Sequence, residues 1–222
     1  MAESGFDFDT ARRVMAEKQV RTWDVLSQRV LEVMETLPRE HFAPERYRKL
    51  AYADIQIPIG HGQVMLNPKI EGRILQALHP ARNESVLDIG TGTGYLSACL
   101  ARMARSVLSV DIVPEFREPA QERIRALDID NVECVTADAA HGLDRSDQFH
   151  AVVVEAALPK LREDFHRHVR EGGRLLLIVG TPPVMEAWLF TRVSKDGWTS
   201  ESLFDTLIPG IIDPSERPDF DF

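Results

Sequence analysis

The sequence lacks any long hydrophobic run, because no stretch approaches the roughly 18 apolar residues that a membrane-spanning helix needs. Its first ten residues, MAESGFDFDT, are acidic and polar where a signal peptide would be basic and then apolar. Cysteine is also scarce, and both cysteines, Cys99 and Cys134, stand in apolar segments. These absences predict a cytoplasmic protein with no membrane partner, in which the cysteines are small core residues rather than disulfide or metal-binding residues.

Positive charge is in short supply as well. The chain has 26 Lys and Arg against 35 Asp and Glu, a formal net charge of −9 at pH 7. A net negative charge repels phosphate backbones, so nucleic acid is a disfavoured partner. Net charge does not exclude a local basic patch that binds nucleic acid. The histidines show no metal-ligand spacing, and His166 and His168 would face apart on a helix. We therefore expect no metal site.

From residue 85 onward, strand-like and helix-like segments alternate, as in a doubly wound, mostly parallel sheet of the α/β class. The pattern predicts strands over residues 85–90, 106–111, 131–136, 149–155 and 173–180, with helices over 95–104, 114–127 and 159–170. Two more strands, 187–194 and 201–208, joined at Asp196-Gly197, would add an antiparallel hairpin and complete a seven-stranded sheet.

The N-terminal section has a different character. Residues 9–37 read as two helices, with Asp9 or Thr10 able to cap the first, a break at residues 22–24, and Pro38 ending the second. This section would form a helical extension beside the sheet.

A glycine-rich turn is the most informative motif. Residues 86–94 place alternate glycines directly after an apolar run and before a helix-like segment, where absent side chains let a ligand approach the backbone. The dinucleotide pattern G-x-G-x-x-G fails because Tyr95 occupies its last position, and the Gly-Lys-Ser/Thr ending of a P-loop is missing. The pattern present, D-x-G-x-G-x-G from Asp88 to Gly94, resembles the first motif of class I S-adenosylmethionine-dependent methyltransferases. A plain structural turn is the other interpretation.

Acidic residues follow the strands next to this turn. Asp111 ends the second strand, where it could accept hydrogen bonds from both ribose hydroxyls or merely cap the following helix. Asp138 ends the third strand, where it could accept from an adenine amino group or act as a turn residue. With Asp88, these acids converge on one crevice that suits a cationic sulfonium nucleoside and opposes a pyrophosphate.

The remaining motifs are similar to one family. Residues 37–44 (LPREHFAP), 59–63 (IGHGQ), 172–175 (GGRL) and 207–209 (LIP) resemble the protein-L-isoaspartate O-methyltransferases. The resemblance implies a Rossmann-like methyltransferase that transfers a methyl group from S-adenosylmethionine to the carboxylate of isoaspartyl residues, which begins protein repair. A carboxylate is already ionised at neutral pH, so this reaction needs orientation and water exclusion rather than a general base.

The resemblance also assigns residues. His61, Gly62 and Gln63 would begin a lid loop near the methyl group, and no catalytic residue is assigned beyond the acceptor-loop candidates His61, Gln63, Val64 and Leu66. The candidate cofactor-binding residues are Ile59, His61, Gly62, Gln63, Asp88, Gly90, Thr91, Gly92, Gly94, Tyr95, Asp111, Ile112, Asp138, Ala139 and Glu155.

Three polar positions in two stretches depart from the pattern that the resemblance implies. Where the family reads Thr-Ile-Ser, this chain has Val64-Met65-Leu66, and Leu66 cannot give the isoaspartyl carboxylate a hydrogen bond of roughly 1.5–3 kcal/mol. Where relatives read Thr-Ala-Ala-x-Pro, this chain begins with Glu155. In the pocket, Glu155 would repel a carboxylate acceptor, or act as a base toward a hydroxyl or amine. Alternatively, Glu155 points to solvent or pairs with an arginine such as Arg162.

The sequence therefore predicts a methyltransferase of the protein-isoaspartate type that acts on an isoaspartyl protein or peptide. One alternative is a methyltransferase of the same fold with a different, small-molecule acceptor that offers a hydroxyl, amine or carboxylate. Another is a non-catalytic S-adenosylmethionine-binding protein. The expected organisation is residues 1–80 as the helical extension with the acceptor loop, 81–212 as the cofactor-binding core, and 213–222 as a tail.

Overall fold

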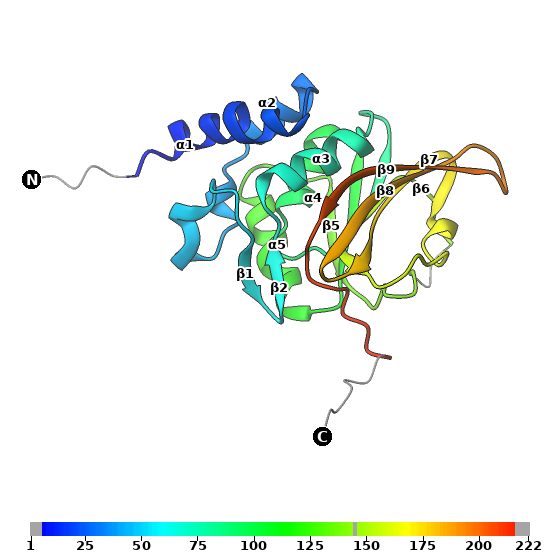
Figure 1. Ribbon diagram of the computed structural model, residues 1–222. Coiled ribbons are helices and arrows are strands. Elements are labelled where there is room, and N and C mark those ends of the chain that lie inside the picture. Colours follow the sequence, from blue (N-terminus) through cyan, green and yellow to red (C-terminus); the bar gives the residue numbers. More distant parts are fainter. Residues whose placement is uncertain (1–5, 144–145, 216–222) are drawn as a thin grey trace, which may run out of the picture.

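A seven-stranded sheet with the order β5-β4-β3-β6-β7-β8-β9 dominates the computed structural model, which describes residues 6–143 and 146–215 (Figure 1). All pairs from β5 to β7 are parallel, whereas β8 runs antiparallel to both β7 and β9. The strands are β3 (Ser85–Ile89), β4 (Ser106–Asp111), β5 (Val132–Thr136), β6 (Phe149–Leu158), β7 (Val169–Thr181), β8 (Val184–Arg192) and β9 (Trp198–Thr206). The predicted mostly parallel sheet with an antiparallel C-terminal hairpin is confirmed.

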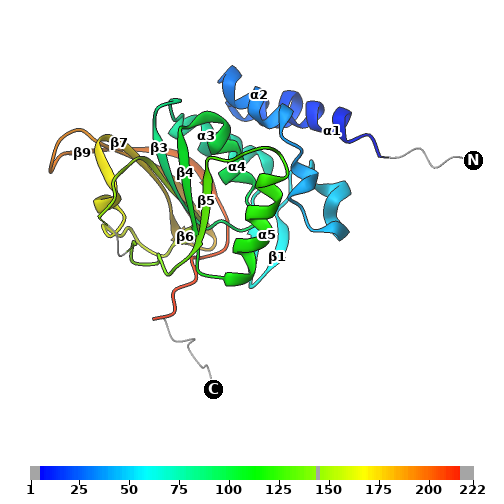
Figure 2. The same ribbon diagram turned by 180° about the vertical axis from the view of Figure 1, so that it is seen from behind.

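Alternation along the strands divides the apolar residues between two faces of the sheet. Val86 belongs to the cluster beneath the helices, while its neighbour Leu87 belongs to the cluster on the other face. That second cluster is closed by loop residues, among them Ala139, Leu143 and Phe165. The helices that cover the first face are α3 (Pro68–Leu78), α4 (Tyr95–Met103) and α5 (Pro114–Arg125), as Figures 1 and 2 show.

The N-terminal section is helical, as expected, and packs on the outside of α3 (Figure 1). Its first helix is capped by Asp7, whose Oδ1 accepts a hydrogen bond of 3.0 Å from the Thr10 N–H, and not by Asp9 or Thr10. The predicted break occurs at Asp24, which has a φ of 59°. The elements are α1 (Phe8–Val14), a π-helical turn (Met15–Val20), a 3₁₀ turn (Arg21–Trp23), α2 (Gln28–Thr36), and 3₁₀ turns at Arg39–His41 and Glu45–Leu50.

A small antiparallel hairpin, β1 (Ile57–Gly60) and β2 (Gln63–Met65), precedes α3. The sequence predicts a loop here. Gly60, His61 and Gly62 all have positive φ at its tip, at 105°, 54° and 71°. The acceptor loop is therefore a hairpin, which lies beside α5 (Figures 1 and 2).

The helix predicted over residues 159–170 is wrong. Within that range the structure forms only a 3₁₀ turn at His166–His168, before β7 begins at Val169. Phe165 is fully buried but Leu161 is 49% exposed, so this segment presents no continuous apolar stripe to the sheet.

The chain after β9 crosses the carboxyl end of the sheet as an extended segment, residues 207–213, which we call the C-terminal strap. Ala157 N–H donates to the Pro209 carbonyl, and Ile211 N–H donates to the Ala157 carbonyl, both at 2.9 Å. The strap is thus joined to β6. Of the predicted tail, residues 216–222 lie outside the described residues.

Candidate active site

The glycine turn lies where β3 passes into α4. Gly90, Gly92 and Gly94 have φ values of 109°, 47° and 89°, which L side chains rarely adopt. A Cβ added at Gly90 would lie 3.1 Å from the Glu155 Cβ, so the backbone is held close to the neighbouring strand. At its glycines the turn therefore presents backbone without side chains at the carboxyl end of the parallel strands.

Asp111 fixes this turn from the end of β4. Its Oδ2 accepts a hydrogen bond from the Gly92 N–H and its Oδ1 one from the Val113 N–H, each at 2.9 Å. Burial raises the pKa of Asp111, while the backbone hydrogen bonds oppose that rise. Because a carboxylate offers about four lone-pair sites, these two bonds leave room for a ligand hydroxyl.

Asp88 lies behind the turn at 0% exposure, in a group of buried hydroxyls. Its Oδ2 accepts from Ser97 Oγ at 2.5 Å and from Ser109 Oγ at 3.2 Å, and Ser109 Oγ also contacts Thr91 Oγ1 at 2.6 Å. The sequence reading missed both serines, although their signal was present as lone hydroxyls within an apolar helix and strand. This network orients Asp88 and supports the turn.

Glu155 stands on β6, where the pairing with β7 shifts between Val153 and Ala157. This irregularity turns the partly buried Glu155 side chain toward the pocket and toward Asp88. The interpretation in which Glu155 points to solvent or pairs with Arg162 is wrong, because Arg162 instead pairs with Asp164 and Asp213, at 3.3 and 3.1 Å.

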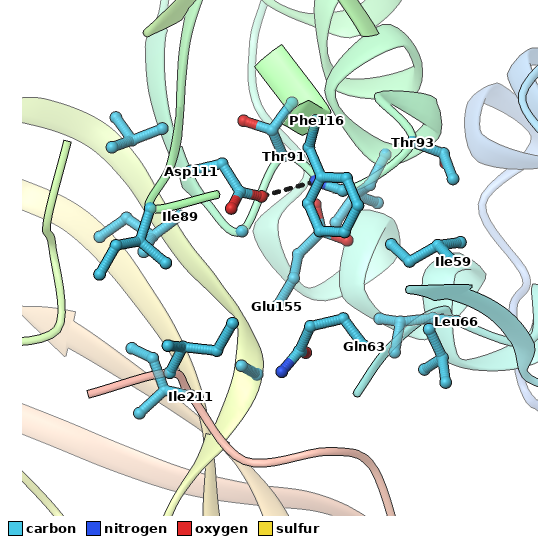
Figure 3. A pocket seen from close by; sticks show the side chains of 18 of the residues that line it. Ile59, Gln63, Leu66, Ile89, Thr91, Thr93, Asp111, Phe116, Glu155 and Ile211 are labelled. Carbon is cyan, nitrogen blue, oxygen red and sulfur yellow. Dashed lines mark hydrogen bonds between the residues drawn. The ribbon is translucent and has the colours of Figure 1, made fainter. Parts of the chain in front are cut away.

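A single pocket joins these groups with the hairpin and the strap (Figure 3). The predicted residues that line it are Ile59, Gln63, Val64, Leu66, Gly90, Thr91, Gly92, Tyr95, Asp111, Ile112, Ala139 and Glu155. Lining residues that the sequence reading did not find are Phe116, Val110, Glu71 and, from the strap, Ile211 and Ile212. Ile211 and Ile212 themselves carry no local motif that could have pointed to this role.

The other predicted residues lie beside the wall. Asp138 is exposed and its Oδ1 accepts from the Ala140 N–H at 2.9 Å, as in a turn, while its neighbour Ala139 lines the pocket. His61, at the hairpin tip next to Gly62, is exposed, and its ring lies edge-on to that of Phe116 at 5.4 Å. Asp88 lies behind the turn, as described above, and Gly94 ends the turn as the residue before α4.

The hairpin is anchored from below by a buried arginine. Arg39 is 0% exposed, donates to the carbonyls of Ala51 (2.7 Å) and Leu66, and forms an ion pair with Glu71. Burial raises the pKa of Glu71 to about 7 against the opposing charge of Arg39. Leu66 is 2% exposed, so its side chain belongs to the core beneath the pocket as well as to the pocket wall.

The strap closes the pocket from the opposite side. Gln63 Nε2 donates to the Gly210 carbonyl at 3.1 Å, which links the hairpin to the strap.

Within residues 6–143 and 146–215 no group of three or more His, Cys, Asp or Glu side chains could hold a metal ion. No helix in that part of the chain is long and apolar enough to cross a membrane.

Comparison with known proteins supplies a family. The family model "Protein-L-isoaspartate(D-aspartate) O-methyltransferase (PCMT)" matches residues 11–203. The protein-L-isoaspartate O-methyltransferase of Aeropyrum pernix is 40% identical over 176 residues, which cover 78% of this chain and 68% of the relative. Protein-L-isoaspartate O-methyltransferase 2 of Marinobacter nauticus is 35% identical over 206 residues, covering 92% of this chain and 94% of the relative.

Two solved structures have the same fold. One is a putative protein-L-isoaspartate O-methyltransferase from Plasmodium falciparum in complex with S-adenosyl-L-homocysteine, with a TM-score of 0.76 at 20% identity, covering 90% of this chain and 98% of that one. The other, also titled protein-L-isoaspartate O-methyltransferase, has a TM-score of 0.75 at 21% identity and covers 90% of this chain and 66% of that one.

Proposed function

The chain belongs to the protein-L-isoaspartate O-methyltransferase family, and from this premise we propose that it methylates the carboxylate of isoaspartyl residues in proteins or peptides. Membership makes it an S-adenosylmethionine-dependent methyltransferase that acts on a carboxyl oxygen. The observation that carries the proposal is the family match over residues 11–203.

The residues of the pocket fit the donor. The glycine turn presents backbone without side chains, and the enclosed atoms Asp88 Oδ1 and Glu155 Oε1 meet no hydrogen-bond donor among the described residues. Buried acceptors without donors call for a ligand that brings positive charge or N–H groups. The methionine end of S-adenosylmethionine brings both.

We assign the parts of the donor as follows. Asp111 would accept from the ribose hydroxyls, using the lone pairs that its bonds to Gly92 and Val113 leave free. The apolar side chains of Ile112 and Ala139 suit the faces of the adenine, and the exposed Asp138 precedes Ala139 in the chain. The backbone of residues 90–94 would face the methionine end.

The donor supplies an electrophilic methyl group when bound. The acceptor carboxylate is ionised at neutral pH, so the chain has to orient it and to exclude water. Ile59 and Leu66 from the hairpin side and Ile211 from the strap enclose the pocket with apolar surface. Gln63 holds hairpin and strap together through the Gly210 carbonyl, which keeps that enclosure closed.

The test uses a peptide with one isoaspartyl residue and the same peptide with aspartate at that position. We expect transfer of a radiolabelled methyl group to the isoaspartyl peptide only. Equal labelling of both peptides, or none of either, would refute the proposed acceptor. Calorimetric titration with S-adenosylhomocysteine tests the donor site separately.

A second candidate is methyl transfer to a small molecule that carries a hydroxyl or an amine. It is favoured by the carboxyl of Glu155 in the pocket wall, which would repel a carboxylate acceptor and attract a cationic one. Donor binding without turnover of the isoaspartyl peptide, combined with methylation of such a small molecule, would support this candidate over the first.

A further inference from the structure

Two carboxyl groups lie close together beside the pocket, Glu155 in its wall and Asp88 buried behind the glycine turn. Asp88 is the last residue but one of β3, Glu155 stands on the adjacent strand β6, and the two side chains lie within hydrogen-bonding reach of each other. Asp88 Oδ1 and Glu155 Oε1 are shut off from solvent, and the described residues supply neither atom with a donor. Two carboxylates can form a hydrogen bond only if one of them keeps its proton. The geometry therefore calls for a shared proton.

The charges around Glu155 favour that arrangement. Burial raises the pKa of Glu155 well above its usual value, and the neighbouring carboxylates of Asp88, Glu71 and Asp111 raise it further. These acids come from β3, α3 and β4, and the thiol of Cys99 faces Glu155 from α4. Every titratable group named here is neutral or negative.

Positive charge near the pair is already engaged. The buried guanidinium of Arg39 forms its ion pair with Glu71. None of the ion pairs within the described chain involves Asp88 or Glu155. A cation that enters the pocket is therefore the group that could release the proton.

We propose that Asp88 and Glu155 share one proton in the free protein, that this proton leaves to solvent when the donor binds, and that Glu155 thereby selects the sulfonium donor over its thioether product. The inference rests on the proposed placement of the donor. Both ligands carry an ammonium group, but only the donor carries the sulfonium charge. The doubly ionised pair is thus stabilised more by the donor than by the product, because two positive charges face it.

The consequence is a donor affinity that depends on pH. Binding of a ligand that prefers the ionised pair strengthens as the pH rises through the range in which the free pair loses its proton. A threonine, which the family resemblance implies at this position, could carry no such charge. Glu155 would therefore add a proton-linked term to donor binding.

The experiment measures heat of binding for S-adenosylmethionine and S-adenosylhomocysteine at pH 6, 7 and 8. Each titration is repeated in phosphate and in Tris, whose ionisation enthalpies differ, so that the difference in heat counts protons. We expect release of up to about one proton with the donor in at least one pH condition, and less with the product. Equal heats in the two buffers at all three pH values would overturn the inference.

Variants assign the proton to its residue. Glu155→Thr and the near-isosteric Glu155→Gln should both abolish the release, and should reduce the preference for donor over product by at least about threefold. Glu133→Gln, at an exposed position on β5, should leave both quantities unchanged. Proton release that persists in both Glu155 variants would overturn the assignment.

The wild-type comparison needs no variant, so the inference stays testable even if a substitution fails to fold. Failure of the inference and failure of the proposed function give different results. Donor binding without proton exchange contradicts only the inference. No binding of either nucleoside would contradict the proposed donor site and the inference together.

Discussion

At the scale of single residues, the glycines near the pocket differ in what surrounds them. Gly94 has a φ of 89°, and a Cβ there would lie 3.0 Å from the Ala120 Cβ. Gly62 has a φ of 71°, but a Cβ there would meet nothing within 4 Å. The two positions therefore separate backbone strain from steric conflict.

We expect Gly62→Ala to lower the free energy of unfolding by about 1–2 kcal/mol, the usual cost of a left-handed alanine. Gly94→Ala should cost about 2–4 kcal/mol, because the packing of α5 against the turn is disturbed as well. Urea denaturation of both variants checks this. Equal losses would mean that the contact with Ala120 has no energetic weight.

The sequence predicts those site residues whose role is set by their own backbone conformation or by their place in the chain. The glycines at positions 90, 92 and 94 are required by backbone conformation, and Asp111 follows from its place after a strand. Glu71 could not be found in this way, because its role depends on a partner far along the chain, whereas Ser97 was missed although its hydroxyl stands alone in an apolar helix. Ser97 donates to Asp88, and Glu71 pairs with Arg39 across 32 positions.

At the scale of elements, the hairpin offers the clearest test of the acceptor. Leu66 is 2% exposed, so Leu66→Ser and Leu66→Ala should each cost about 2–5 kcal/mol of unfolding free energy. The two variants differ by one hydroxyl. On an isoaspartyl peptide we expect kcat/KM of the serine variant to exceed that of the alanine variant by about tenfold, the value of one hydrogen bond to a charged group.

The alanine variant is the control, because it loses the same packing without gaining a donor. Equal kcat/KM for the two variants would show that position 66 does not contact the acceptor. Steady-state methyl transfer, with thermal melting to confirm that both variants fold, gives the answer.

The strap depends on a second contact, between Asp213 and Arg162 at 3.1 Å. The Ser215 hydroxyl and the Arg162 guanidinium lower the pKa of Asp213 to about 2. Its contribution is therefore complete above pH 4 and is lost as the pH falls toward 2. Asp213→Asn should imitate that loss at neutral pH and speed hydrogen exchange of the Ile211 amide, which bonds to the Ala157 carbonyl.

Asp196→Asn, in the turn between β8 and β9, serves as the matched control and should leave exchange of the Ile211 amide unchanged. An unchanged rate in Asp213→Asn would mean that the strap is held by its bonds to β6 and Gln63 alone.

The elements that sequence reasoning placed well are those with strong periodicity. The strand predicted over 106–111 matches β4 in full, because an apolar run between polar turns has few alternatives. The hairpin β1–β2 was missed, since its short strands carry almost no alternation. Helix α3 was missed as well. Residues 159–170 have a helix-like composition, yet the fold buries Phe165 and Val169 there without a helix and leaves Leu161 in solvent.

At the scale of the whole molecule, the raised pKa of Glu155 predicts how stability changes with pH. An acid whose pKa is higher in the folded state opposes folding increasingly as the pH rises above its unfolded value near 4.5. We therefore expect Glu155→Thr to gain stability relative to wild type with rising pH, by at most about 1.4 kcal/mol per unit. Urea denaturation at pH 5 to 8 measures the difference.

The pH dependence of the wild-type unfolding free energy also contains a contribution from histidines. Burial lowers the pKa of His150, His166 and His168, which makes the folded state more stable as the pH rises, opposite to the effect of Glu155. The histidine contributions cancel when the unfolding free energy of a variant is compared with that of wild type at the same pH. A stability difference between Glu155→Thr and wild type that stays constant with pH would contradict the prediction.

The hydrophobic cluster beneath the helices contains Val30 and Met34 of α2, Leu75 of α3 and Leu100 of α4 without interruption. Segments that share one apolar cluster gain and lose order together, so the N-terminal helices and the sheet should melt as a single calorimetric transition. A ligand held only at the glycine turn would then raise the melting temperature of α2, which does not touch it. The melting temperature of the N-terminal helices would then report whether a nucleoside is bound at the glycine turn.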